Sequence, residues 1–238
     1  MWHANSAIDE PHPEAGNVIF FILLGIVLLG LVTAAMRSGG LEGSNIDRES
    51  VSIGLSRMKD QANAIERGVA FILQNGASES DLRFAHADAA SEYGNDPTVT
   101  PQFQLFNRAG GGVEYLSPPV GINDGSNWEF FGNSHLPQVG SALPDLIAVL
   151  PNLTEAACTA INRQAGYTGT PTDDGGASGS SDCIDSAASD RFSSTTQFPG
   201  IASNTTNEAS FSLKPAMQGC ITCSVDGSRH YYRVLLAR

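Results

Sequence analysis

The stretch Asn17–Met36 has the sequence N-V-I-F-F-I-L-L-G-I-V-L-L-G-L-V-T-A-A-M and contains no charged residue. As an α-helix with a rise of about 1.5 Å per residue, it would be about 30 Å long, which matches the hydrocarbon core of a bilayer. No other part of the chain has a comparable apolar run. We therefore predict one membrane-spanning helix over residues 17–37, with the folded part of the chain after it.

The composition outside this helix is polar and acidic. The 238 residues carry a formal net charge of −12, only 16% of them are charged, and Gly 25 and Pro 12 indicate many loops. Nucleic-acid binding requires a basic surface, so this charge argues against a nucleic-acid partner. We expect the membrane, and other copies of the chain or related subunits, as partners.

A second helix is predicted over residues 46–75 by the strongest periodic pattern in the chain. Its apolar residues follow each other at spacings of 4 and 3, which places them on one face of a helix. They are Val51, Leu55, Met58, Ala62, Ile65, Val69 and Ile72. Three glycines in residues 38–45 predict a break before this helix, and Asn75-Gly76 predicts its end.

Residues 76–238 predict an α+β domain outside the cytoplasm, with a small antiparallel sheet and a strand at its end. Short strands are expected at residues 102–106, 113–116, 128–131 and 230–236, from their aromatic or β-branched residues and flanking turns. Asp145–Leu150 is a continuous apolar run, which fits either a strand or a buried helix. Thr154 is a suitable N-cap for a helix that reaches Gln164.

Four cysteines lie in the last third of the chain: Cys158, Cys183, Cys220 and Cys223. An even number beyond a membrane or export segment favours disulfides in an oxidising compartment, with three possible pairings. The alternatives are a zinc site, and free or redox-active thiols. A zinc site is disfavoured because only one C-x-x-C occurs and the other two cysteines are single and far apart. The segment around the C-x-x-C resembles a turn before a strand, which disfavours the redox role because that role needs Cys220 to open a helix.

The sequence contains no pattern typical of a catalytic site, and we expect no enzymatic activity. There is no G-x-S-x-G, no H-E-x-x-H and no phosphate-binding glycine loop with a lysine. No cofactor is expected, except that Asp173, Asp174 and Asp182 lie in or beside a Gly/Ser-rich loop whose carboxylates suit calcium. The alternative is a solvated acidic loop without a metal.

Residues 1–16 predict a hydrophilic leader without Lys or Arg, and the apolar run begins directly after Ala15-Gly16. Ordinary signal-peptide cleavage before Ala35 is one alternative, which would release a secreted protein. Arg37 and Arg48 follow the apolar run, and this charge taken alone favours a cytoplasmic C-terminal part. The cysteines and the Gly/Ser-rich composition favour an extracytoplasmic one.

A short leader that ends in glycine, before an apolar helix that is retained, resembles the type IV pilins and the pseudopilins of type II secretion. The segments G-N-V-I-F-F-I-L-L at Gly16, V-L-P-N-L-T at Val149 and Y-Y-R-V-L-L-A-R at Tyr231 are similar to a group of uncharacterised bacterial pilin-like proteins. The resemblance implies cleavage between Gly16 and Asn17. Family leaders are usually basic, and Phe21 occupies the position where the family usually has Glu.

The resemblance also implies a fold and a function. We expect one long N-terminal helix, half membrane-spanning and half amphipathic, packed on the sheet. The chain would be a structural subunit of a pilus-like or pseudopilus filament, held in the bacterial inner membrane before assembly and afterwards in a periplasmic or cell-surface filament. The helix residues expected in the filament core are Phe20, Phe21, Gly25, Gly30 and Ala34. The alternative is a membrane-anchored binding or adhesion domain that does not assemble.

Overall fold

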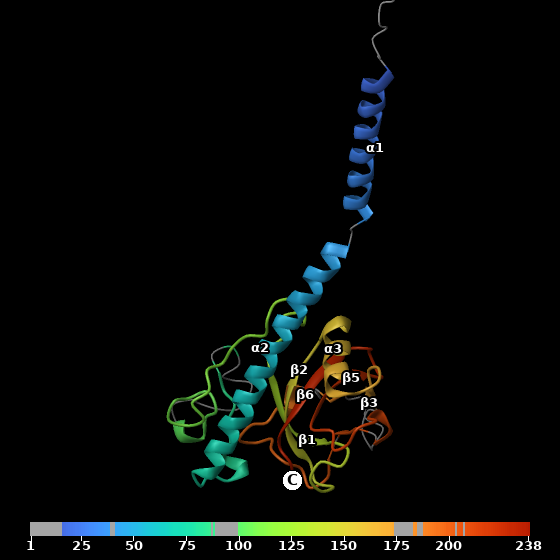
Figure 1. Ribbon diagram of the computed structural model, residues 1–238. Coiled ribbons are helices and arrows are strands. Elements are labelled where there is room, and N and C mark those ends of the chain that lie inside the picture. Colours follow the sequence, from blue (N-terminus) through green and yellow to red (C-terminus); the bar gives the residue numbers. More distant parts are fainter. Residues whose placement is uncertain are drawn as a thin grey trace, which may run out of the picture. The chain divides into compact units, whose positions relative to one another are not determined.

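The computed structural model describes residues 16–38, 41–86, 88, 100–173, 183–184, 188–202, 204–206 and 208–238 (Figure 1). The described side chains are those of residues 18–34 in the first helix, and they resume at residue 49. The chain divides into two compact units, residues 1–48 and 49–238. Each unit is described by itself.

Helix α1 (Gly16–Ser38) coincides with the helix predicted over residues 17–37, and α2 (Leu41–Gln74) contains the predicted amphipathic helix. The predicted glycine-rich break over residues 38–45 is wrong in its extent, because α2 already begins at Leu41 and includes Gly43. A single glycine within a helix costs only about 1 kcal/mol relative to alanine, so it does not interrupt a helix of this length.

The apolar stripe of α2 is buried, as its spacing predicts. From Leu55 to Ile72 each of its residues is at most 2% exposed, and Val51 is partly buried at the start of the stripe. The stripe shares one core cluster with residues of helix α3 (Glu155–Ala165) and of the sheet. Across this contact, Glu66 of α2 accepts hydrogen bonds from Nε and Nη2 of Arg233, at 3.0 and 2.6 Å.

Four antiparallel strands form the centre of the sheet, in the order β5-β6-β2-β1. Their bounds are β1 (Glu129–His135), β2 (Asp145–Leu150), β5 (Gln218–Cys223) and β6 (Arg229–Leu236). The two-residue strands β3 (Thr172–Asp173) and β4 (Asn204–Thr205) pair in parallel at the two edges. This arrangement confirms the α+β class.

Strand β2 decides between the two predictions for the apolar run Asp145–Leu150. Leu146, Ala148 and Leu150 face the cluster that contains α2 and α3, whereas Ile147 and Val149 face a second cluster on the other side of the sheet. Because both faces of this central strand are covered, the run is continuously apolar and does not alternate.

Two of the four predicted short strands, residues 102–106 and 113–116, are not strands in the structure. Residues 102–106 contain a 3-10 turn, Pro101–Phe103, and a single bridge from Gln104 to Arg83. Residues 113–116 belong to no strand among the described residues. The remaining 3-10 turns are Glu79–Asp81, Ala188–Asp190 and Glu208–Ser210.

Instead of joining the sheet, residues 111–122 run along α2, and we call this segment the strap. Gly68, Gln61 and Gly54 contact it in turn; they are seven residues apart and so share one side of the helix. A Cβ on Gly68 would lie 2.5 Å from Cγ2 of Val113, and a Cβ on Gly54 would lie 2.8 Å from Cδ1 of Ile122. Between them, Nε2 of Gln61 donates a 3.0 Å hydrogen bond to the Glu114 carbonyl. Two glycines and one amide therefore hold the strap against the helix backbone.

Helix α3 begins and ends as its sequence predicts. The Thr154 side chain accepts a hydrogen bond from the Ala157 N–H, and Gly166 ends the helix at φ 85°. Within α3, the buried Asn162 donates to the carbonyl oxygens of Gly169 and Cys220, at 3.0 and 2.8 Å, and accepts from the Cys220 N–H at 2.8 Å. The side chain of Asn162 thus bonds both backbone groups of Cys220 in β5.

Candidate functional site

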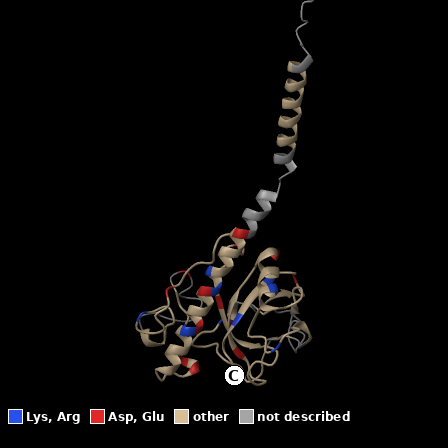
Figure 2. Ribbon diagram, viewed as in Figure 1, with Lys and Arg blue, Asp and Glu red and all other residues tan. Residues whose placement is uncertain are grey.

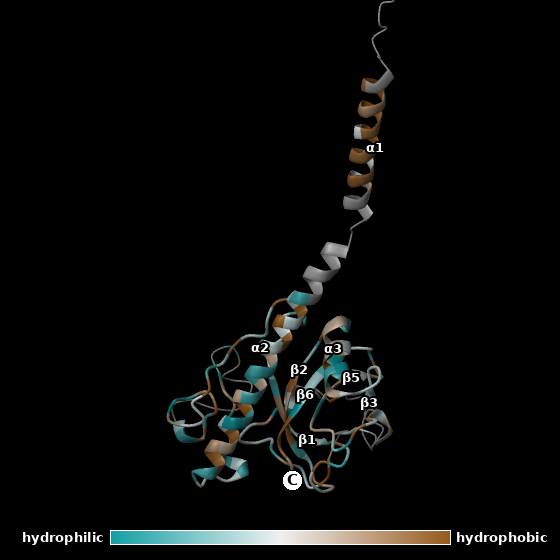
Figure 3. Ribbon diagram, viewed as in Figure 1, coloured by the Kyte–Doolittle hydropathy of each residue, from teal (hydrophilic) through white to brown (hydrophobic). Residues whose placement is uncertain are grey.

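The surface of α1 is the most unusual feature among the described residues. Its large apolar side chains from Val18 to Val32 are each between 45% and 67% exposed, including Phe20 at 61% and Phe21 at 62%. The described part of α1 carries no charge, as Figure 2 shows, and is strongly apolar in Figure 3. A contiguous apolar surface of this size marks a site of association with protein or lipid.

Among the residues whose placement is described, no helix is both long enough and apolar enough to cross a membrane.

Small residues on α1 leave room for close approach, but they do not all share one face. A Cβ added to Gly25 or Gly30 would meet no atom within 4 Å. At about 100° per residue, Gly30 and Ala34 lie on the same side of the helix, whereas Gly25 lies about 140° from Gly30. The Gly30 and Ala34 pair has the small-xxx-small spacing that lets helix backbones pack closely. Thr33 donates its hydroxyl to the Leu29 and Gly30 carbonyls, at 2.9 and 3.0 Å, so it adds no unpaired polar group there.

The predicted leader lies outside the described residues except for Gly16, where α1 begins. The backbone at the predicted cleavage position, Gly16 and Asn17, is helical, and nothing further is described of the Asn17 side chain.

All four cysteines form disulfides, which leaves no free thiol in the chain. The pairs are Cys158–Cys220 and Cys183–Cys223, with Cα–Cα distances of 5.3 and 5.4 Å. This pairing confirms the disulfide prediction and excludes the four-cysteine zinc site for the paired state. Cys220 and Cys223 lie within β5, so the prediction that they form a turn before a strand is wrong; the turn follows at residues 224–226.

The calcium prediction falls mostly outside the described residues. Asp174 and Asp182 are not described, and only the backbone of Asp173 is, in β3. Elsewhere in the described part, a sulfur of Cys183, a sulfur of Cys223 and an oxygen of Asp226 lie within 4.8 Å of one another. Both sulfurs belong to a disulfide and therefore offer no thiolate to a metal.

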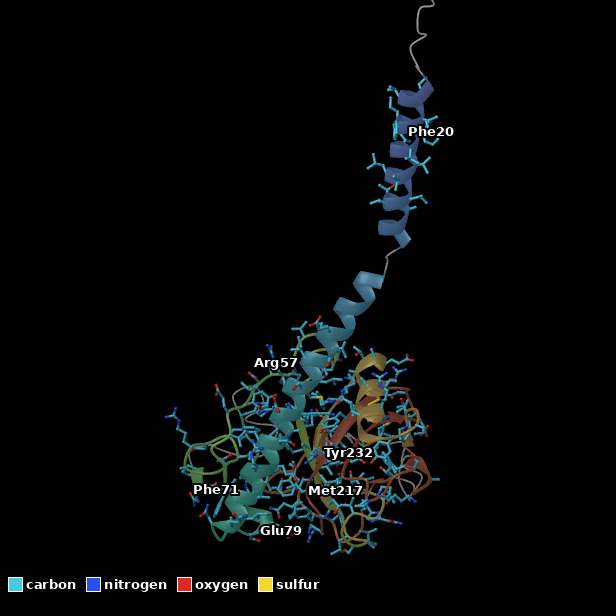
Figure 4. The ribbon with its side chains drawn as sticks, in the orientation of Figure 1. Phe20, Arg57, Phe71, Glu79, Met217 and Tyr232 are labelled. Carbon is cyan, nitrogen blue, oxygen red and sulfur yellow. A yellow bond between two sulfur atoms is a disulfide. The ribbon has the colours of Figure 1, made fainter. Side chains whose placement is uncertain are left out.

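A groove of about 840 Å³ lies between the outer side of α2 and the strap, and the sequence did not predict it. Its apolar lining includes Ala64, Phe71, Val113 and Leu116, and the side chains of Phe71 and Leu116 are 54% and 52% exposed. Figure 4 shows Phe71 projecting from the end of α2. Only the position of the strap makes this groove, because its two walls are about 50 residues apart in sequence.

Two titratable groups near this helix have shifted pKa values. Burial raises the pKa of Tyr115, in the strap, to about 12; its hydroxyl accepts a 3.3 Å hydrogen bond from the Trp128 N–H. Burial, and secondarily the positive charge of Arg233, lowers the pKa of Lys59 on α2. Both shifts follow from packing inside the folded unit, so they identify no catalytic group.

No family model, curated protein or solved structure matches this chain. The interpretation of the site therefore depends on the residues of this chain alone.

Proposed function

We propose that the chain is a structural subunit of a pilin-like filament, assembled through packing of α1 against the α1 helices of other copies. The observation that carries this proposal is the uncharged, exposed apolar surface of residues 18–34. A helix that is apolar on all sides requires a non-aqueous environment.

Energetics support this requirement. Burying the exposed half of a large aliphatic side chain contributes about 1 kcal/mol, and more for phenylalanine. Thirteen such side chains lie between Val18 and Val32, so leaving them in water would cost on the order of 10 kcal/mol. We propose that α1 is held in the bacterial inner membrane before assembly and that the same surface is later covered by neighbouring helices in a periplasmic or cell-surface filament.

The folded unit supports a location outside the cytoplasm. It contains two disulfides, which form and persist in oxidising compartments. Its own core clusters on both faces of the sheet need no assembly to be complete. The same observation favours the second candidate function, a membrane-anchored binding or adhesion domain that remains single.

A photo-crosslinking experiment separates the two. A benzophenone amino acid is placed at Phe20 of the full chain in bacterial membranes, and a control carries it at Val225, which is 57% exposed in the turn after β5. Assembly through α1 predicts a ladder of chain–chain products from position 20. An anchored single domain predicts adducts of one chain with lipid at position 20, and this outcome would overturn the filament proposal.

The N-terminus of the same preparations gives an independent measurement by mass spectrometry. Pilin-like processing predicts a chain that starts at Asn17 and keeps α1. A chain that starts at Ala35 would have lost the helix on which the proposal depends.

A further inference from the structure

One side of α2 carries a stripe formed by the exposed Asp60, Arg67 and Phe71 and the half-buried Ala64, all of which line the groove. Their spacings of 4, 3 and 4 place them within about 60° of one another around the helix. Asp60 and Arg67 are exposed and form no ion pair with another described residue. The stripe therefore offers one acid, one base, one small residue and one large apolar residue to a partner.

The charge of this surface differs from that of the whole chain. The groove is lined by two arginines, Arg57 and Arg67, and by two acids, Asp60 and Glu114, so its formal charge is zero. The chain has a net charge of −12, which makes two copies repel each other over most of their surfaces. A neutral face with both signs and an exposed Phe71 is suited to contact with a second copy.

We propose that α2 packs in parallel against α2 of a second copy, displaced by seven residues. At this displacement, Asp60 of one copy lies level with Arg67 of the next, and Ala64 lies level with Phe71. The phenyl ring then enters the groove beside Ala64, between α2 and the strap, while the two charges pair at its side. Seven residues correspond to a step of about 10.5 Å along the helix.

Other registers satisfy only part of this pattern. In an antiparallel pairing that keeps Asp60 opposite Arg67, Phe71 lies opposite Ser56 and not opposite Ala64. A parallel displacement of three residues pairs Arg57 with Asp60 and brings Phe71 onto Gly68. The space beside Gly68 is already filled by Val113 and Leu105, whose atoms lie 2.5 and 2.6 Å from a Cβ built there.

The proposed contact uses Asp60 and Ala64 of one copy and Arg67 and Phe71 of the next. Because all four residues lie on one side of α2, the stripe accommodates one partner helix at a time, so the contact joins copies in pairs within the filament. The inference rests on the proposed filament function and adds to it a contact made by the folded unit.

The test is a charge exchange, read by the chain–chain ladder from the photo-crosslinker at Phe20. Asp60→Arg and Arg67→Asp should each reduce the ladder about tenfold or more, since each places like charges opposite each other. The double variant Asp60→Arg with Arg67→Asp should restore it to within about twofold. Arg163→Asp is the matched control, because Arg163 is an exposed arginine on α3 that does not line the groove.

A second measurement uses a short bismaleimide linker, which reacts with free thiols and leaves the disulfide-bonded cysteines unchanged. Chains with Ala64→Cys mixed with chains with Phe71→Cys should crosslink to each other, and each variant alone should not. The inference would be overturned if the single charge variants left the ladder unchanged, or if the double variant were no better than either single one. It would also be overturned if Arg163→Asp abolished the ladder.

Failure of this inference and failure of the proposed function give different results. If wild-type chains produce the ladder from position 20 but the exchange has no effect, only the α2 contact is wrong. If wild-type chains produce no ladder, the filament function and the contact are both wrong.

Discussion

Replacing Asn162 by alanine should strongly destabilise the folded unit. This side chain is 1% exposed and makes three hydrogen bonds, two of them to the backbone of Cys220. Removing it leaves the N–H and C=O of a buried strand residue without the amide that bonds them. Each such group costs about 1–3 kcal/mol, so we expect a loss of about 2–5 kcal/mol in the free energy of unfolding.

The assay is guanidinium unfolding of the full chain in detergent, followed by fluorescence of the buried Trp128. Asn75→Ala is the control, because Asn75 is exposed and donates a single 2.9 Å hydrogen bond to the Phe71 carbonyl. We expect this control to lose less than about 1 kcal/mol. A loss for Asn162→Ala within about 0.5 kcal/mol of the control would refute the role assigned to the amide.

A second variant at the same position tests the direction of the hydrogen bonds. Asn162→Asp keeps an acceptor for the Cys220 N–H but, when ionised, cannot donate to the carbonyls of Gly169 and Cys220. It should therefore be at least as destabilising as alanine at neutral pH and should recover partly in acid, where the protonated carboxyl donates again. Equal stability of Asn162→Asp and wild type at neutral pH would contradict this geometry.

Three further predictions concern other parts of the folded unit. Gly68→Ala should lower the free energy of unfolding by about 1–3 kcal/mol, because the added Cβ would overlap Val113. Gly25→Ala is the control in thermal melts. A Cβ at Gly25 meets nothing within 4 Å, so this variant should leave the free energy of unfolding unchanged. Burial raises the pKa of Asp145, so the native state binds this proton more tightly than the unfolded chain does. The contribution of Asp145 to stability should then fall as pH rises from about 4 through its raised pKa, and unfolding measured from pH 3 to 7 against Asp145→Asn should show that slope. A double alanine variant that removes the Cys183–Cys223 disulfide should lower the free energy of unfolding by about 4 kcal/mol, because this disulfide closes a loop of 40 residues. Denaturant unfolding measures the loss, and an unchanged midpoint would contradict the prediction.

Local patterns predicted the helices well. The 4 and 3 spacing from Val51 to Ile72 depends only on the helical repeat, and the caps of α3 depend on residues within one turn of its ends. The extent of the break before α2 was wrong because one glycine, Gly43, lowers helical stability without excluding a helix.

Sequence patterns that fit more than one kind of local structure were less informative. Residues 113–116 were predicted as a strand from their aromatic and β-branched residues, but they lie against Gln61 and Gly68 of α2. The C-x-x-C segment was predicted as a turn, whereas it is a strand paired with β6. The paired residues lie seven or more positions further along the chain, so the local sequence does not show this pairing. The candidate groove was not predicted at all, since its walls come from two distant segments.

The sequence by itself determined that one helix is apolar on every side and that a second has one apolar face, and it favoured disulfides for the four cysteines. These properties depend on residue type and on spacing along a single helix. Only the tertiary structure decided which cysteines pair, which face of β2 meets α2, and where the strap leaves a groove. Those outcomes depend on the packing of segments far apart in the chain, whose relative positions are decided by the free energy of the whole core.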